Sequence, residues 1–224
     1  MELELITSIL IIIGIDIVLG GDNAIVIALA CRNLPEKQRN KAIVLGAVLA
    51  IILRIICTIL AVFLLKVPFL QFVGGCFLIL IAYKLLTDHH EEENKIRAGV
   101  SLSAAVKTIV IADLVMGLDN VIAVAGAAHG RIHLVVLGLI VSIPIIIWGS
   151  KLILFIMERF PIFIYAGAAI LAYTAGKMIV HEERLSHLSN QYEDLFSFLP
   201  FLIIFCVIAF GYLSNKMRMN YSTK

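Results

Sequence analysis

The sequence has little charge, and this shortage decides its class. Only 15% of the 224 residues are charged, while 61% are hydrophobic and the mean hydropathy is +1.03. Soluble domains carry about 25% charged residues, so a water-soluble globular domain is excluded in favour of a membrane protein. The net charge of +2 comes without a basic cluster interleaved with aromatics. We therefore expect no nucleic-acid partner.

Cysteine pairs and enzyme signatures are also missing. The cysteines show no CxxC spacing and lie in or beside apolar runs, so we expect small buried hydrophobes rather than disulfides or a soft-metal site. They are Cys31, Cys57, Cys76 and Cys206. No Ser/His/Asp set, phosphate-binding loop or dinucleotide motif appears, and HEERLSH (181–187) lacks the i, i+4 histidine spacing of a zinc protease. Without a dedicated base or nucleophile, we expect no enzyme and no permanently bound cofactor.

Long apolar runs are what the chain does contain. A helix crosses the bilayer core with about 20 apolar residues, and seven runs approach that length. They are Leu5–Cys31, Ala42–Leu65, Pro68–Leu86, Ser101–Ala128, Ile132–Met157, Ile162–Val180 and Phe198–Ser214. Each span must satisfy its own backbone hydrogen bonds in the lipid bilayer. The predicted fold class is therefore all-α transmembrane, with seven helices.

Lysine and arginine are unevenly distributed between the connections, and this asymmetry predicts the orientation. The first connection, the third connection with its edge, and the C-terminal tail are the basic ones. Their basic residues are Arg32, Lys37, Arg39, Lys41, Lys84, Lys95, Arg97, Lys216, Arg218 and Lys224. We expect a multi-pass plasma-membrane protein with its N-terminus outside and its C-terminus in the cytoplasm.

The first and fourth spans carry the same motif. Residues 14–30 read GIDIVLGGDNAIVIALA, and residues 111–127 read IADLVMGLDNVIAVAGA. At an offset of 97 residues, the matches are Asp16 with Asp113, Gly20 with Gly117, Asp22 with Asp119 and Asn23 with Asn120. At an offset of 93, the matches are Pro68 with Pro161, Gly74 with Gly167 and Lys84 with Lys177. The chain thus repeats a three-span unit. Because three is odd, the second copy crosses the membrane in the opposite sense, as in the inverted repeats of secondary transporters.

The repeat divides the chain into predicted domains. They are a first three-helix repeat (1–87), an acidic and histidine-containing cytoplasmic loop (88–100), a second three-helix repeat (101–181), an external loop (182–197), and a seventh helix with a cytoplasmic tail (198–224). The meeting place of the two copies, near the middle of the membrane, is where such transporters bind their substrates.

Carboxylates in the duplicated motif need a counter-charge. An ionised carboxylate at the bilayer centre costs at least about 2.5–3.5 kcal/mol. Antiparallel pairing of spans one and four would gather six side chains into an oxygen-rich cage. They are Asp16, Asp22, Asn23, Asp113, Asp119 and Asn120. Since the cage has neither sulfur nor imidazole, it favours hard divalent cations such as Mg²⁺, Ca²⁺ and Mn²⁺.

Glycines inside the motif predict interrupted helices. On a straight helix Asp16 and Asp22, six residues apart, would point about 240° apart. A break at Gly20-Gly21 would let both point inward and would free backbone carbonyls as ligands. The second copy has only Gly117 at this place, so we expect a milder break there.

Several polar residues in the spans have more than one interpretation. The duplicated residues could bind helices together, but four embedded aspartates suit an ion or proton pathway better. Arg54, about mid-depth in span two, is a partner for one of the aspartates, a fixed cation that modulates the charge of the site, or a snorkelling residue on a shorter span. Thr58 and Ser150 are candidates to hydrogen-bond the site.

The two D-x5-DN segments resemble the TerC family of integral membrane proteins. The opening GIDIVLGGDNAIVIAL, the loop RNLPEKQRNKAI and the segment IADLVMGLDNV are most similar to a short bacterial branch of that family, and the resemblance covers the whole chain. That branch is associated with manganese efflux. The resemblance implies that the six motif residues form the ion site, and it implies none of the large cytoplasmic domains of longer relatives.

The predicted function is export of Mn²⁺ by alternating access, with the direction taken from the resemblance alone. Inward proton flow is a compatible coupling, because carboxylates release metal when they are protonated. Two alternatives stay open: a transporter of another cation such as Ca²⁺ or Mg²⁺, or of a basic solute, and a membrane protein that loads metal onto exported partners. A homo-oligomer is neither required nor excluded by the sequence.

Overall fold

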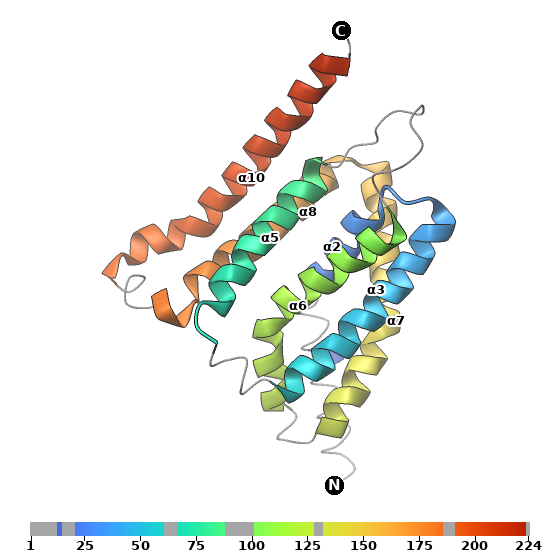
Figure 1. The fold of residues 1–224 in the computed structure, drawn as a ribbon, viewed down its shortest axis with the longest axis vertical. Helices are drawn as coiled ribbons and strands as arrows, with labels where there is room; N and C mark the ends of the chain where they lie inside the picture. Colours follow the sequence, from blue (N-terminus) through green and yellow to red (C-terminus); the bar gives the residue numbers. More distant parts are fainter. Residues whose placement is uncertain are drawn as a thin grey trace. The chain divides into compact units, whose positions relative to one another are not determined.

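The computed structural model describes residues 13–14, 21–60, 67–87, 101–127, 132–185 and 191–222, with the side chains of 118–127, 132, 193–194 and 218–222 left aside. Within these residues there are seven α-helices and no strand (Figure 1). The helices are α2 (Gly21–Cys31), α3 (Glu36–Ile59), α5 (Leu70–Thr87), α6 (Leu102–Ala127), α7 (Ile132–Arg159), α8 (Ile162–Val180) and α10 (Glu193–Ser222), with a 3-10 helix η1 (Glu183–Leu185). Five helices of the described part are long and apolar enough to cross a membrane. The predicted all-α transmembrane class is confirmed.

Two helices extend beyond the apolar runs that predicted them. α3 begins at Glu36, directly after Pro35, so the basic residues of the first connection from Lys37 onward lie on its first turns. Proline has no N–H to continue a preceding helix but is well tolerated at a helix start. α10 begins at Glu193, inside the range predicted as an external loop. Hydropathy marks where a helix meets lipid, whereas the helix itself continues into the polar boundary.

The described helices form two compact units that cut across the sequence repeat. The first unit comprises Met1–Val67 with Ser101–Ile156, and the second comprises Pro68–Val100 with Met157–Lys224. Equivalent helices of the two copies pack together in each case: α2 against α6 in the first unit, and α5 against α8 in the second. Each unit thus contains helices from both copies. The inverted topology of the copies is consistent with this pairing and stays a prediction.

The first unit is organised around the contact of α3 with α6. A Cβ added to Gly46 would lie 2.7 Å from Ile109 Cδ1, so the missing side chain lets the two helices approach closely. Further along, Arg54 of α3 meets Asp113 of α6. Because the contacts advance in the same direction on both helices, α3 and α6 run parallel.

The second unit is organised around α5, α8 and α10. The carboxylate of Glu182, after the end of α8, accepts hydrogen bonds from the backbone N–H groups of Phe69, Gln71 and Phe72 at 3.1, 3.1 and 3.2 Å. The end of α8 therefore lies at the start of α5, which makes the two helices antiparallel. At the other end, Asn215 of α10 donates its side-chain N–H to the Leu86 carbonyl at 3.3 Å.

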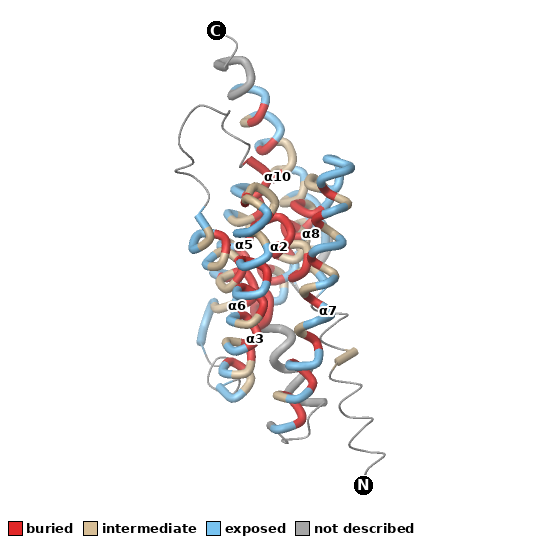
Figure 2. The backbone as a smooth tube through the Cα atoms, turned by 90° about the vertical axis from the view of Figure 1, so that its right-hand side faces the viewer, coloured by how far each residue is buried: buried red, intermediate tan, exposed pale blue. Residues whose placement is uncertain are grey.

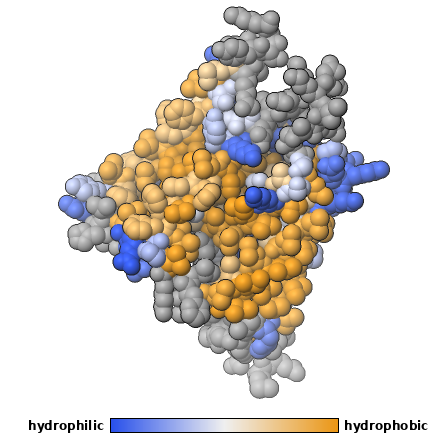
Figure 3. Space-filling view, viewed as in Figure 1, coloured by the Kyte–Doolittle hydropathy of each residue, from blue (hydrophilic) through white to orange (hydrophobic). Residues whose placement is uncertain are grey.

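Apolar side chains cover the outward faces of both units. Buried residues follow stripes along the helices, and exposed ones occupy the opposite faces (Figure 2). Trp148 on α7 and Phe205 on α10 are each 70% exposed. Most of the described surface in Figure 3 is hydrophobic. Such a surface suits lipid, since a soluble monomer rarely exposes a large contiguous apolar patch.

Replacing the buried cap of α5 tests the second unit. We expect Glu182→Ala to lower the free energy of unfolding by about 1–3 kcal/mol, because three backbone donors lose a charged acceptor. Glu182→Gln keeps one acceptor and should lie in between. Thermal unfolding in detergent, followed by circular dichroism, measures the change. The neighbouring Glu183 is exposed, so Glu183→Ala is the matched control, and equal melting temperatures for both alanine variants would contradict the capping role.

Candidate functional site

The predicted site residues belong to the first unit, and the structure describes four of the seven with their side chains. These are Asp22 and Asn23 on α2, Arg54 on α3 and Asp113 on α6. Asp16 lies outside the described residues. Asp119 and Asn120 lie on α6, and only their backbone is described. The three helices pack against one another, since α2 contacts both α3 and α6.

The predicted break in the second copy is wrong. α6 runs as one helix from Leu102 to Ala127, straight through Gly117. A lone glycine inside a helix costs about 1 kcal/mol relative to alanine and does not by itself interrupt it. The corresponding expectation for Gly20-Gly21 falls partly on Gly20, outside the described residues.

Arg54 and Asp113 form an ion pair between α3 and α6. Arg54 Nη2 donates to Asp113 Oδ1. Only 2% of Arg54 and 7% of Asp113 is exposed, so both charges are held inside the protein. This is the first of the interpretations of Arg54, partnership with an aspartate, and burial excludes the snorkelling one. Removing one partner of such a pair leaves an uncompensated buried charge.

The local sequence explains why Arg54 faces inward. On α3 the buried positions Ile43, Ala47, Ala50, Arg54 and Cys57 recur every three or four residues, which is one helical stripe. Arginine occupies a place in this stripe where the neighbouring positions are apolar. A Cβ added to Gly117, one turn after Asp113 on α6, would lie 3.6 Å from Arg54 Nε. The guanidinium therefore extends along α6 from Asp113 toward Gly117.

Asn23 is a buried amide with open hydrogen-bonding capacity. It is 3% exposed, and neither Oδ1 nor Nδ2 has a hydrogen-bond partner among the described residues. Burying an amide without compensation costs roughly 2–7 kcal/mol. The neighbouring Asp22 is partly buried. A cation that binds oxygen at this point of α2 would offset the free-energy cost of burying the Asn23 amide. An amide that only joined helices together would already have its hydrogen-bond partners.

Thr58 and Ser150 donate within their own helices. Thr58 Oγ1 donates to the Arg54 carbonyl at 2.8 Å, and Ser150 Oγ donates to the Ile146 carbonyl at 2.6 Å. Each hydroxyl has a single proton, and in the structure that proton is donated to the backbone of its own helix. The i−4 carbonyl is the nearest acceptor for a serine or threonine in an apolar helix, and hydrogen bonding of these two hydroxyls to the site stays a prediction.

The described donors do not complete a metal site by themselves. No three His, Cys, Asp or Glu side chains of the described part gather at a spacing that holds a metal. Asp22, Asn23 and Asp113 supply oxygen, and two of the predicted carboxylates, Asp16 and Asp119, have side chains outside the described set. These three residues are oxygen donors of the kind that a hard cation takes, and one of them, Asp113, is paired with the positive charge of Arg54.

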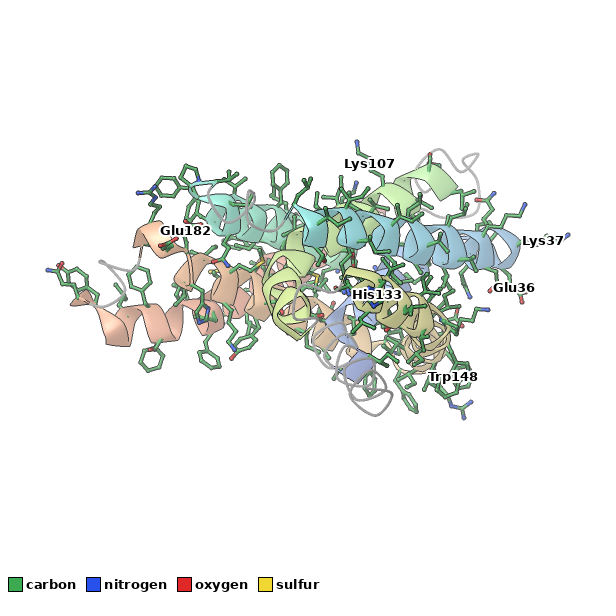
Figure 4. The ribbon with its side chains drawn as sticks, turned by 90° about the horizontal axis from the view of Figure 1, so that it is seen from below. Glu36, Lys37, Lys107, His133, Trp148 and Glu182 are labelled. Carbon is green, nitrogen blue, oxygen red and sulfur yellow. The ribbon has the colours of Figure 1, made fainter. Side chains whose placement is uncertain are left out.

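Glu182 is a residue whose role the sequence did not reveal. It lies in HEERLSH, which lacks the spacing of a zinc protease, yet Glu182 is 5% exposed and its carboxylate caps α5 (Figure 4). The signal was an acidic residue just after the sixth span, in a topology that returns the sixth span to the start of the third. A carboxylate there meets free N–H groups of a helix start.

Comparisons with known proteins give one family model and several similar proteins. The description "Integral membrane protein TerC family" matches residues 1–219. The "Uncharacterized membrane protein YjbE" of Bacillus subtilis is 52% identical over 208 residues, covering 93% of this chain and 95% of that protein. A "UPF0053 protein" of Haemophilus influenzae is 27% identical over 64% of this chain and 68% of its own length. The "Uncharacterized membrane protein YceF" of Bacillus subtilis is 27% identical over 70% of this chain and 63% of its own. No solved structure matches the chain.

Proposed function

Because the chain belongs to the TerC family of integral membrane proteins, we propose that it carries a divalent metal cation across the membrane and that its substrate is Mn²⁺, exported from the cytoplasm. The observation that carries the proposal is Asn23, an amide buried in an apolar span whose hydrogen-bonding atoms have no partner among the described residues. It lies in the first copy of the acidic motif, on a helix packed against the second copy.

The donor chemistry supports a hard cation. The motif residues offer carboxylate and amide oxygens, which suit Mn²⁺, Mg²⁺ and Ca²⁺ better than Zn²⁺ or Cu⁺. The four cysteines of the chain are free, and neither Cys31 nor Cys57 is part of the motif. Selection of manganese over the other hard cations, and export rather than import, rest on the resemblance to the short branch of the family.

The repeat supports alternating access. In an inverted repeat the two copies can exchange conformations, which opens a shared midplane site first to one side and then to the other. The packing of the equivalent helices α2 and α6 within one compact unit supports a site shared by the two copies. An ion held between them would be reached from either side as the copies change roles.

Reconstitution of the purified chain in liposomes tests the proposed function. We expect Mn²⁺ to cross the membrane of protein-containing vesicles and not of empty ones, and Mn²⁺ to be preferred in competition with Ca²⁺, Mg²⁺ and lysine. Preference for one of the competitors would replace the substrate. Binding of Mn²⁺ without flux would favour the alternative of a metal-loading protein, and neither binding nor flux would refute the proposal.

Proton coupling is a separate prediction. If inward protons drive export, raising the external pH at constant internal pH should slow Mn²⁺ efflux, because the inward proton gradient shrinks. Efflux from loaded cells or right-side-out vesicles measures the rate across an external pH series. A protonophore should abolish the dependence, and a rate independent of external pH would contradict the coupling while leaving the transport proposal intact.

A further inference from the structure

We propose that Arg54 is a built-in counter-cation that sets the charge of the ion site by holding Asp113 as an ion pair. This inference rests on the proposed function and deepens it. The pair is buried on both sides, and it joins the helix that carries the second acidic motif to a helix that carries none. Arg54 thus acts on the ion through Asp113, as a residue that positions and neutralises one carboxylate.

The two copies of the repeat differ at this point. Leu45–Gly46 matches Leu137–Gly138 in sequence, and the same register places Ile146 opposite Arg54 and Ser150 opposite Thr58. In the structure Thr58 donates to the Arg54 carbonyl and Ser150 donates to the Ile146 carbonyl, the i−4 bond that serine and threonine commonly make in helices. Two equivalent hydroxyls therefore bind two equivalent carbonyls.

The two residues that bear these carbonyls, Arg54 and Ile146, have different side chains. Ile146 is 8% exposed and carries no charge. At the position equivalent to Arg54, the second copy therefore has no cation. The repeat is symmetric in its acidic motifs and asymmetric in the charge that faces them.

Helix packing fixes Arg54 at the level of Asp113. The close approach of Gly46 to Ile109 sets the register of α3 against α6, and Arg54 lies on the same buried stripe of α3 as Gly46. On α6, Asp113 follows Ile109 by one turn and is buried on the same face. The position of the guanidinium is therefore fixed by the packing of two helices and does not depend on a loop.

The charge balance gives the pair its effect on transport. In a low-dielectric interior, one unit of charge near the site changes the affinity for a divalent cation strongly. Four ionised aspartates would hold the cation tightly and would slow its release. With Arg54 bound to Asp113, the site carries one negative charge less, which favours release to the other side.

The two halves of the pair have opposite predicted effects. Arg54→Gln leaves Asp113 without its cation and makes the site more negative, so the KM for Mn²⁺ should fall by about tenfold and the maximal rate should fall with slower release. Asp113→Asn leaves the positive charge of Arg54 uncompensated, so the KM should rise by about tenfold. The double variant Arg54→Gln with Asp113→Asn removes both charges of the pair, so its KM should lie between the KM values of the two single variants. Arg54→Lys keeps the charge and should leave the KM within about threefold of that of the original chain.

The experiment is Mn²⁺ uptake into proteoliposomes containing equal amounts of folded protein. The matched control is Lys107→Gln, which removes a positive charge from an exposed position on α6 pointing outward (Figure 4) and should leave the KM unchanged. A merely structural pair would lower the amount of folded protein in both single variants without opposite shifts in KM. The opposite signs and their cancellation are the signature of charge setting.

Several results would overturn the inference. They are KM shifts of the same sign in both single variants, a double variant as defective as Asp113→Asn, or Arg54→Lys as defective as Arg54→Gln. If one single variant does not fold, the double variant is compared with the other: a KM that returns toward that of the original chain supports charge balance, and a KM no closer to the original refutes it. Failure of the original chain to transport Mn²⁺ refutes the proposed function and this inference together, whereas an active original chain with a failed cycle refutes the inference alone.

Discussion

Asp22→Asn should abolish manganese efflux, with a loss of more than about a hundredfold in rate, because even supporting groups around a bound metal are worth up to that factor. The substitution keeps the size and shape of the side chain and removes its charge, so the packing of α2 against α6 and α3 is preserved. Asp22 adjoins Asn23, whose buried amide has no hydrogen-bond partner among the described residues and carries the proposed ion site. Efflux from manganese-loaded cells, corrected for protein in the membrane, measures the effect.

The control for this prediction is a carboxylate outside the span. Glu36 is exposed at the first turn of α3 (Figure 4), and Glu36→Gln removes one negative charge without touching the motif. It should transport like the original chain. Asp119→Asn extends the test to the second copy, where the expectation follows from the repeat alone. Unchanged efflux in both Asp22→Asn and Asp119→Asn would remove the acidic motif from the transport mechanism.

Helix positions could be predicted from the sequence because lipid imposes a length and an apolar composition on each span. α8 coincides with the predicted run Ile162–Val180, and α6 differs from its run by a single residue at each end. The repeat also predicted the pairing of spans one and four, which α2 and α6 form, but it did not predict the contact of α3 with α6. A sequence repeat shows which segments are related, whereas a compact unit shows which helices are in contact. Here each unit contains helices from both copies.

The pairing of Arg54 with Asp113 shows where sequence reasoning stops. Both residues were candidates, and an embedded arginine needs a carboxylate. The chain offers four embedded aspartates, and the choice depends on the register of α3 against α6. That register follows from the contact of Gly46 with Ile109, which no periodicity along one helix reveals. The cap on α5 is similar, because Glu182 lies more than 100 residues from the N–H groups that it accepts.

Gly176→Ala should produce a large loss of stability in the second unit. A Cβ at this position would lie 2.5 Å from the Cα of Pro200, a backbone atom of α10 that no side-chain rotation can move away. α10 must shift from α8, and overpacking of this kind costs typically about 1–3 kcal/mol, occasionally more. We expect a clearly lower melting temperature in detergent and less protein in the membrane.

Gly149 on α7 supplies the matched control, since a Cβ there would meet nothing within 4 Å. Gly149→Ala should therefore keep or slightly raise the melting temperature, because alanine is the better helix former. Equal melting temperatures for the two variants would contradict the close packing of α8 and α10. Gly176 and Pro200 both lie in the second unit, whereas the acidic motifs lie in the first. The KM for Mn²⁺ of the folded fraction of Gly176→Ala should therefore match that of the original chain, in contrast to the opposite KM shifts expected at Arg54 and Asp113.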